Sequence, residues 1–204
     1  MTGQTDYSQK GVATVEFSFI AMIVIVLALG IVEFGSLIEA QAVVTNVGRE
    51  GGNLASRDLK TGQDLLDLLA ASSAPLDFQN TPEHYKIYIA KANAAMSQGE
   101  IPTCTAEERG ALVGEGVESP VTLSKCGLTN ELYGYLEFDS ATETAAISQF
   151  TIVIVYYAHT PVTPLAKVLQ HPFFNSGSIL NFDMPDVDSV VNYDSMLIGT
   201  TAIF

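Results

Sequence analysis

The chain has 204 residues, which suits one domain of ordinary size with an additional segment. It carries 23 acidic and 9 basic residues, and the resulting net charge is −14 at pH 7, without any basic cluster along the chain. This charge argues against binding to nucleic acid and to anionic lipid surfaces, and it identifies no other ligand.

The first predicted element is a membrane-spanning helix at residues 12–32. Its only charged residue is Glu16, and most of the others are Val, Ile, Leu or Phe. A helix of this length covers about 31 Å, close to the roughly 30 Å of a bilayer's hydrocarbon core. Its apolar side chains favour insertion by on the order of 6 kcal/mol, whereas one central charge costs roughly 3 kcal/mol, so the segment inserts despite Glu16. No other apolar run in the sequence approaches this length, and we predict a single span.

The residues before the span form a short polar leader that ends in Lys10 and Gly11, and Glu16 follows five residues after the glycine. This pattern resembles the class III signal of type IV pilins and pseudopilins, in which a membrane peptidase cuts after the glycine. The resemblance implies that Gly11 precedes the cut and that Val12 becomes the new N-terminus. A conventional cleaved secretory signal is the alternative, but the helix continues past the apolar region without an Ala-x-Ala-like site.

Glu16 has a physical role under this interpretation. Cleavage after Gly11 creates an amine at Val12, and a carboxylate one helical turn further on is a natural counter-ion in a low-dielectric setting. In type IV filaments this pairing is thought to be made to the amine of a neighbouring subunit, so the resemblance implies an assembly role for Glu16. The alternative is an interfacial glutamate that reaches for lipid headgroups.

The sequence around and after the span narrows the resemblance. Several polar and aromatic residues occur in an order that helicity does not demand: Val15 to Phe17, Glu33 to Gly35, Gln41, Asn46, and Arg49 to Gly51. They resemble the N-terminal signature of TadE-like pseudopilins of the tight-adherence (Flp, type IVb) pilus system. Residues 150–169 also resemble that family's hydrophobic strand and the proline-bearing, membrane-proximal segment that follows it.

Past the span the sequence remains helical to about Arg57. Apolar residues recur at spacings of three and four and form one stripe: Leu37, Ala40, Val44, Val47, Gly51 and Leu54. Gly48 and Gly52 have the four-residue spacing of close interfaces between helices. A kink or helix end near Arg49 is the alternative, since glycine weakens a helix. Glu33 is predicted to mark the exit of the helix into water.

Residues 58–204 are predicted to form an acidic extracytoplasmic domain. A short helix is expected at 63–71, and a second helix is expected to begin at Thr81 and Pro82, run to Met96 and stop at Gly99. Strands are expected at 132–138, 150–158 and 196–204. The predicted fold class is α+β. A leader at 1–11 and a long helix at 12–57 precede a small domain with short helices and a three- to four-stranded antiparallel sheet.

Cys104 and Cys126 are the two cysteines of the chain. If the span carries this part of the chain out of the cytoplasm, the pair enters an oxidising compartment and is predicted to form a disulfide. Closing a loop of this length stabilises a domain by roughly 3 kcal/mol in the chain-entropy model. The alternative is two buried free thiols, and the spacing is not that of a zinc motif.

The sequence shows no catalytic constellation. Its three histidines stand apart, and it has no phosphate-binding glycine loop and no nucleophile elbow. We therefore predict no enzyme activity, no metal site and no cofactor. Four aspartates near the C-terminus could offer oxygen ligands to calcium, but they lack EF-hand spacing, and a solvated acidic loop is the alternative. They are Asp183, Asp186, Asp188 and Asp194.

The resemblance implies a TadE-like pilin or minor pseudopilin, a structural component of a type IVb pilus that serves adhesion and surface attachment. The implied partners are other pilin subunits, a prepilin peptidase and the inner-membrane assembly platform. The implied location is the inner membrane, with a cytoplasmic N-terminus and a periplasmic C-terminal domain, and the pilus surface after assembly. The length favours a minor subunit by analogy with short main pilins. Two alternatives are an uncleaved single-pass anchor with a periplasmic binding domain and a membrane-tethered enzyme.

Overall fold

The structure is a computed structural model and describes residues 6–57, 62–93, 101–128, 149–164 and 196–204. It divides into two compact units, Met1–Ile38 with Pro161–Phe182, and Glu39–Thr160 with Asp183–Phe204. The predicted strand at 132–138 lies outside the described residues, and so do the four aspartates at positions 183, 186, 188 and 194.

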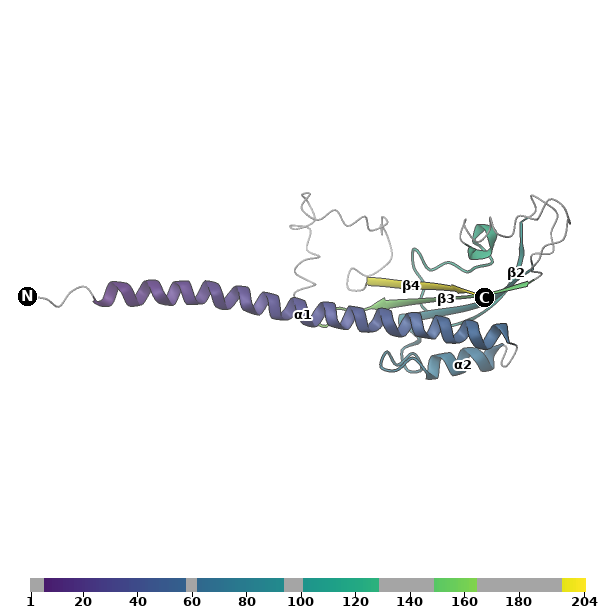
Figure 1. Cartoon of the computed structure of the whole chain (residues 1–204), viewed down its shortest axis with the longest axis horizontal. Coiled ribbons are helices and arrows are strands. Elements are labelled where there is room, and N and C mark those ends of the chain that lie inside the picture. Colours follow the sequence, from purple (N-terminus) through teal and green to yellow (C-terminus); the bar gives the residue numbers. More distant parts are fainter. Residues whose placement is uncertain (1–5, 58–61, 94–100, 129–148, 165–195) are drawn as a thin grey trace, which may run out of the picture. The chain divides into compact units, whose positions relative to one another are not determined.

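Helix α1 extends from Asp6 to Ser56 and contributes to both units (Figure 1). Its sequence contains no proline, so every residue can take part in the helical hydrogen-bond ladder. The C-terminal end of α1 agrees with the prediction to within one residue. Its N-terminal end includes residues 6–11, which the sequence assigned to the leader.

A four-stranded antiparallel sheet forms the centre of the second unit, in the order β2-β1-β3-β4. The strands are β1 (Tyr85–Asn93), β2 (Thr103–Arg109), β3 (Gln149–His159) and β4 (Met196–Ile203). With α1 and α2 (Gln63–Ala71) they make an α+β fold, as predicted. The predicted helix at 63–71 and the predicted strands at 150–158 and 196–204 are confirmed.

The prediction of a helix from Thr81 to Met96 is wrong. A single 3-10 turn, η1, occupies Pro82–His84, and β1 begins directly after it. β1 lies between β2 and β3, and residues 85–90 are buried without alternation. A strand that is buried on both faces does not show the period of two that distinguishes strands from helices, so its apolar residues also fitted a helical spacing. The pairing with two distant strands decided between the two structures.

Two helices cover one face of the sheet in the second unit. α2 buries Leu65, Leu66, Leu69 and Ala70, and the part of α1 in this unit buries Ala40, Val44, Val47 and Ala55. Phe78, in the connection from α2 to β1, stacks on Tyr85 with the ring centroids 4.3 Å apart. Most of the apolar stripe predicted beyond the span therefore packs against the sheet of the same chain.

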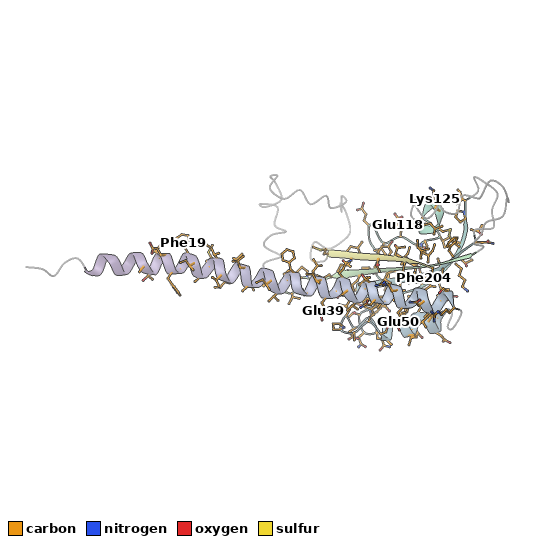
Figure 2. All side chains as sticks on the ribbon, viewed as in Figure 1. Phe19, Glu39, Glu50, Glu118, Lys125 and Phe204 are labelled. Carbon is orange, nitrogen blue, oxygen red and sulfur yellow. A yellow bond between two sulfur atoms is a disulfide. The ribbon has the colours of Figure 1, made fainter. Side chains whose placement is uncertain are left out.

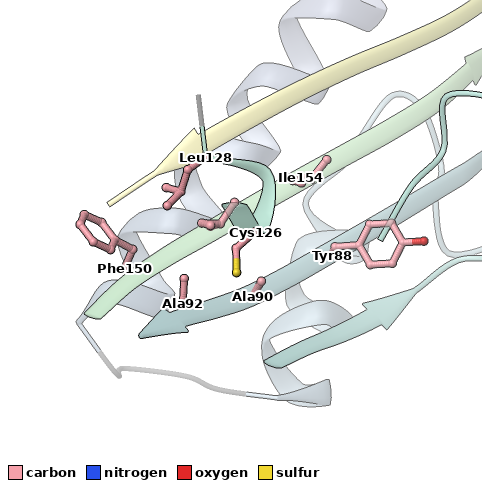
Figure 3. Packing of buried hydrophobic residues seen from close by; sticks show 8 residues of the cluster. Tyr88, Ala90, Ala92, Cys126, Leu128, Phe150 and Ile154 are labelled. Atoms are coloured by element: carbon pink, nitrogen blue, oxygen red, sulfur yellow. The ribbon is translucent and has the colours of Figure 1, made fainter. Parts of the chain in front are cut away.

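The opposite face of the sheet carries a second hydrophobic cluster (Figure 3). Its buried members are Tyr88, Ala90, Ala92, Cys126, Leu128, Phe150, Ile152 and Ile154. Most come from β1 and β3, and Cys126 comes from η2, a 3-10 turn at Ser124–Gly127. Because both faces are covered, β3 is apolar on both of its sides, as the sequence indicated.

The glycines near the end of α1 let the helix approach its own core. A Cβ added to Gly51 would lie 2.8 Å from Cδ1 of Leu69 and 3.2 Å from Cγ1 of Val153. A Cβ on Gly48 would lie 3.0 Å from Cγ2 of Thr200, and one on Gly52 would overlap the ring of Phe204. The helix continues through all three glycines, so the alternative of a kink or end at this point is wrong. The close approach that these glycines permit is made within the chain.

Candidate functional site

The N-terminal part of α1 exposes an apolar surface. An 18-residue window within Ala13–Ser56 has a mean hydropathy of 2.7, and none of it is buried. In the described part of the chain, this is the one helix that is long and apolar enough to cross a membrane. Phe17 is 71% exposed and Ile31 is 72% exposed, and Phe19 projects from the same part of the helix (Figure 2). Such a surface is unfavourable in water, and it makes this helix a candidate membrane anchor.

The predicted cleavage site lies near the start of this helix. Gly11 and Val12 are within the first two turns of α1, which begins at Asp6. A glycine lowers the stability of a helix by up to about 1 kcal/mol relative to alanine. The helix is therefore less stable at the bond after Gly11, which is the predicted cleavage site.

Glu16 lies one helical turn after Val12, and its side chain is exposed. Side chains on an α-helix lean toward the N-terminus, which directs the carboxylate of Glu16 toward the position of an amine formed at Val12. Neighbouring polar groups are satisfied locally, since the hydroxyl of Ser18 donates a hydrogen bond to the carbonyl oxygen of Thr14 at 2.8 Å. The structure thus places an exposed carboxylate one turn after Val12, and the counter-ion role of Glu16 stays a prediction.

Glu33 is bonded to a residue far away in the sequence. Its Oε2 accepts hydrogen bonds from the backbone N–H and from the hydroxyl of Thr163, both at 2.9 Å. Glu33 is half-buried and Thr163 is only 6% exposed, so the carboxylate has a folded partner, and the exit of the helix into water at Glu33 stays a prediction. Sequence reasoning missed Thr163, because the two residues are 130 positions apart and no local pattern connects them.

The signature residues past the span lie on two faces of α1. Gly51 is buried against the sheet, whereas the polar members beyond Glu39 are exposed on the helix: Gln41, Asn46, Arg49 and Glu50. Glu50 is labelled on this part of the helix in Figure 2. Packing against the sheet explains the glycine at position 51, and it does not explain the exposed polar members.

The two cysteines form a disulfide. Cys104 lies on β2 and Cys126 lies on η2, with their Cα atoms 5.9 Å apart, within the range that disulfides adopt. Cys126 is 3% exposed and belongs to the second hydrophobic cluster. The bond therefore fastens the segment that covers this face to the edge strand of the sheet.

The titratable groups of the second unit take part in packing and in ion pairs. Lys86 lies 3.0 Å from the carboxylate of Glu108, and Arg109 pairs with Asp67 and donates from Nε to the hydroxyl of Tyr85 at 3.1 Å. These contacts tie β2 to β1 and to α2. The residues that the structure describes contain no group of three or more His, Cys, Asp or Glu side chains that could hold a metal ion.

Four tyrosines of the sheet have perturbed hydroxyl groups. Burial raises the pKa of Tyr85 and Tyr157 above the ordinary value of 10.0. Burial also raises the pKa of Tyr88 and Tyr156, and for Tyr88 the carboxylate of Glu108 adds to the effect. All four phenols are therefore neutral at physiological pH. Tyr88 and Tyr156 pack edge to face, with their ring centroids 6.3 Å apart. This is a common geometry for aromatic side chains that pack on a sheet.

Comparison with protein families gave one match. The model of the TadE-like protein family matches residues 11–53, which begin at Gly11 and include the apolar helix and the buried glycines. The predicted resemblance to TadE-like proteins is confirmed over this segment, and it indicates a protein associated with the Tad pilus. No curated protein and no solved structure matched the chain.

Proposed function

We propose that this TadE-like chain is a pilin or minor pseudopilin of the tight-adherence pilus. It is made as an inner-membrane precursor with a cytoplasmic N-terminus, is cut after Gly11 by a prepilin peptidase, and then assembles with other pilin subunits in a structure that serves surface attachment. The observation that carries this proposal is the start of the family match at Gly11, the residue before the proposed cut, five positions before Glu16.

The exposed surface of α1 supports assembly through the first part of the helix. The stripe beyond Glu39 is packed against the chain's own sheet, with Ala40 and Val44 fully buried. The surface that remains for lipid or for other apolar helices runs from about Ala13 to Ile38. Glu16 lies within this surface and serves as the counter-ion to the amine of Val12 on a neighbouring subunit.

The second unit faces the periplasm or the cell exterior under this proposal. Its disulfide between Cys104 and Cys126 agrees with an oxidising compartment, where such bonds form and persist. The unit contributes no catalysis, and its length relative to short main pilins favours a minor subunit.

The test is N-terminal sequencing of the full chain after co-expression with an active prepilin peptidase. We expect a product that begins at Val12. A Gly11→Leu variant is the control and is expected to remain uncut, since the bulky side chain replaces the glycine before the bond. A wild-type product that still begins before Val12, while the same peptidase cuts another pilin, contradicts the proposal. That result would favour an uncleaved single-pass anchor with a periplasmic binding domain.

A further inference from the structure

The carboxylate of Glu33 holds a returning segment against α1. After β3 ends at His159 the chain reaches Thr163, whose N–H and hydroxyl both donate to Oε2 of Glu33 at 2.9 Å. Both residues belong to the first unit, together with the exposed apolar part of the helix. The backbone and the side chain of Thr163 are both held by one carboxylate oxygen. The two hydrogen bonds therefore fix the conformation of the turn as well as its position on α1.

The helix around Glu33 is covered on one side and bare on the other. Glu33, Ser36 and Leu37 share one face and are half-buried. The opposite face carries Ile31, Phe34 and Ile38, at spacings of three and four, and these are 72%, 67% and 68% exposed. The apolar surface of the span thus continues past Glu33, on the face that does not carry the carboxylate.

The returning turn presents an apolar side chain of its own. Val162, next to Thr163, is 64% exposed, although Thr163 is buried. Residues 161–164 carry no charge. At the level of Glu33 the unit therefore exposes aliphatic side chains from both the helix and the turn, while the carboxylate of Glu33 is hydrogen-bonded to Thr163.

The length of this surface indicates what covers it. From Ala13 to Ile38 the helix rises by about 39 Å, which exceeds the roughly 30 Å of a hydrocarbon core and falls within the roughly 40–45 Å of a bilayer with its headgroup regions. If residues 12–32 fill the core, Phe34, Ile38 and Val162 are at the level of the outer headgroup and acyl boundary. Exposed aliphatic side chains are favourable at that depth and unfavourable in water.

We propose that the turn at Pro161–Pro164 is a second bilayer contact, in which the Glu33–Thr163 pair holds Val162 at the outer lipid interface. This inference rests on the proposed membrane anchoring of α1. The contact is apolar and the chain is strongly acidic, so the partner is the acyl region of the bilayer and anionic headgroups are not required. Glu33 is a positioning residue here, since it acts on lipid contact through Thr163.

The experiment uses the full chain with a Val162→Cys substitution in phosphatidylcholine vesicles. The native cysteines are joined to each other, so an environment-sensitive fluorophore labels the new thiol selectively under non-reducing conditions. We expect blue-shifted emission and quenching by lipids with a nitroxide near the headgroup. A Phe19→Cys label, tested with a lipid that carries its nitroxide deep on the acyl chain, reports insertion of the span. A label on Val113, an exposed residue of the other unit, supplies the emission of a label in water.

Variants of the pair test the role of Glu33. Glu33→Ala removes the acceptor and should abolish the blue shift and the quenching at position 162, while the Phe19→Cys label stays quenched. Thr163→Ser keeps both donors and should preserve the signal, and Thr163→Val, which keeps only the N–H, should reduce it. Because these two variants retain Glu33, they test the pair even where Glu33→Ala fails to insert.

The outcomes separate the two proposals. A quenched label at position 19 with a water-like label at position 162 overturns the second contact and leaves the anchor intact. Absence of quenching at both positions overturns the anchor itself. Quenching at position 162 that is equal in the wild type, Glu33→Ala and Thr163→Val overturns the assignment to Glu33.

Discussion

Gly51 of α1 lies against Leu69 of α2, so close that a Cβ on the glycine would be 2.8 Å from Cδ1 of the leucine. Leu69 is fully buried, and Val153 of β3 lies on the other side of the same site. The glycine therefore allows α1, α2 and the sheet to meet at one point. The packing of the second unit therefore depends on a residue without a side chain at this position.

A Gly51→Ala substitution should destabilise the second unit, because a methyl group is forced into a packed core at a cost of about 1–3 kcal/mol. This cost should outweigh the gain of up to about 1 kcal/mol from the better helix propensity of alanine. Denaturant unfolding of the full chain in detergent measures the difference. Gly35→Ala on the same helix is the control, since nothing lies within 4 Å of an added Cβ there. Equal stability of Gly51→Ala and the wild type would contradict the packing at this site.

Loss of the disulfide should lower the free energy of unfolding by roughly 3 kcal/mol in the chain-entropy model. The bond spans 22 positions and fastens η2 over the second hydrophobic cluster. The measurement compares chemical unfolding of the wild type with and without reductant. A Cys104→Ser, Cys126→Ser double variant should match the reduced wild type and show no response to reductant. A reductant effect that persists in the double variant would place its origin outside this bond.

Glu16→Ala should leave cleavage after Gly11 largely intact and abolish incorporation into filaments, under the proposed pilin function. The carboxylate is the counter-ion to the amine that cleavage creates, so its loss affects the step after cleavage. Glu16→Gln, which keeps the shape without the charge, should fail in the same way, and Ser18→Ala at a nearby exposed position should assemble. N-terminal sequencing and recovery of sheared filaments separate the two steps. Normal assembly of Glu16→Ala would remove the assembly role of this residue.

Alkaline pH should destabilise the second unit through its buried tyrosines. Burial raises the pKa of Tyr85, Tyr88, Tyr156 and Tyr157 above 10.0 in the folded state. Because the folded state favours the neutral phenol, this stability is fully present below the unfolded pKa near 10 and is lost as pH rises through the raised folded values. The free energy of unfolding, followed with tyrosinate absorbance, should therefore fall above pH 10.

Tyr157→Phe removes one of these four contributions with little change in shape, since burial alone raises the pKa of Tyr157. Its stability should fall less steeply with alkaline pH than that of the wild type. Identical slopes for the two proteins would mean that ionisation of Tyr157 is not linked to unfolding.

The sequence by itself determined those features that depend on neighbours along the chain. The span, the Gly11 to Glu16 spacing, the TadE-like signature, α2 and the cores of β3 and β4 could all be read from composition and local periodicity. The two cysteines were also paired correctly, because a chain with only two has one intramolecular pairing. Local hydropathy and spacing are properties of the helix or strand itself, so no knowledge of distant residues was needed.

Only the tertiary structure decided which partners these elements have. β1 was mistaken for a helix because both its faces are buried, and its pairing with β2 and β3 lies outside any local window. The buried glycines were read as an interface or a kink, and the sheet that they meet comes from residues 149–159 and 196–204. Glu33 accepts hydrogen bonds from Thr163, which is 130 positions away. In each case the sequence specifies which groups need a partner, and the folded chain brings the partner to them.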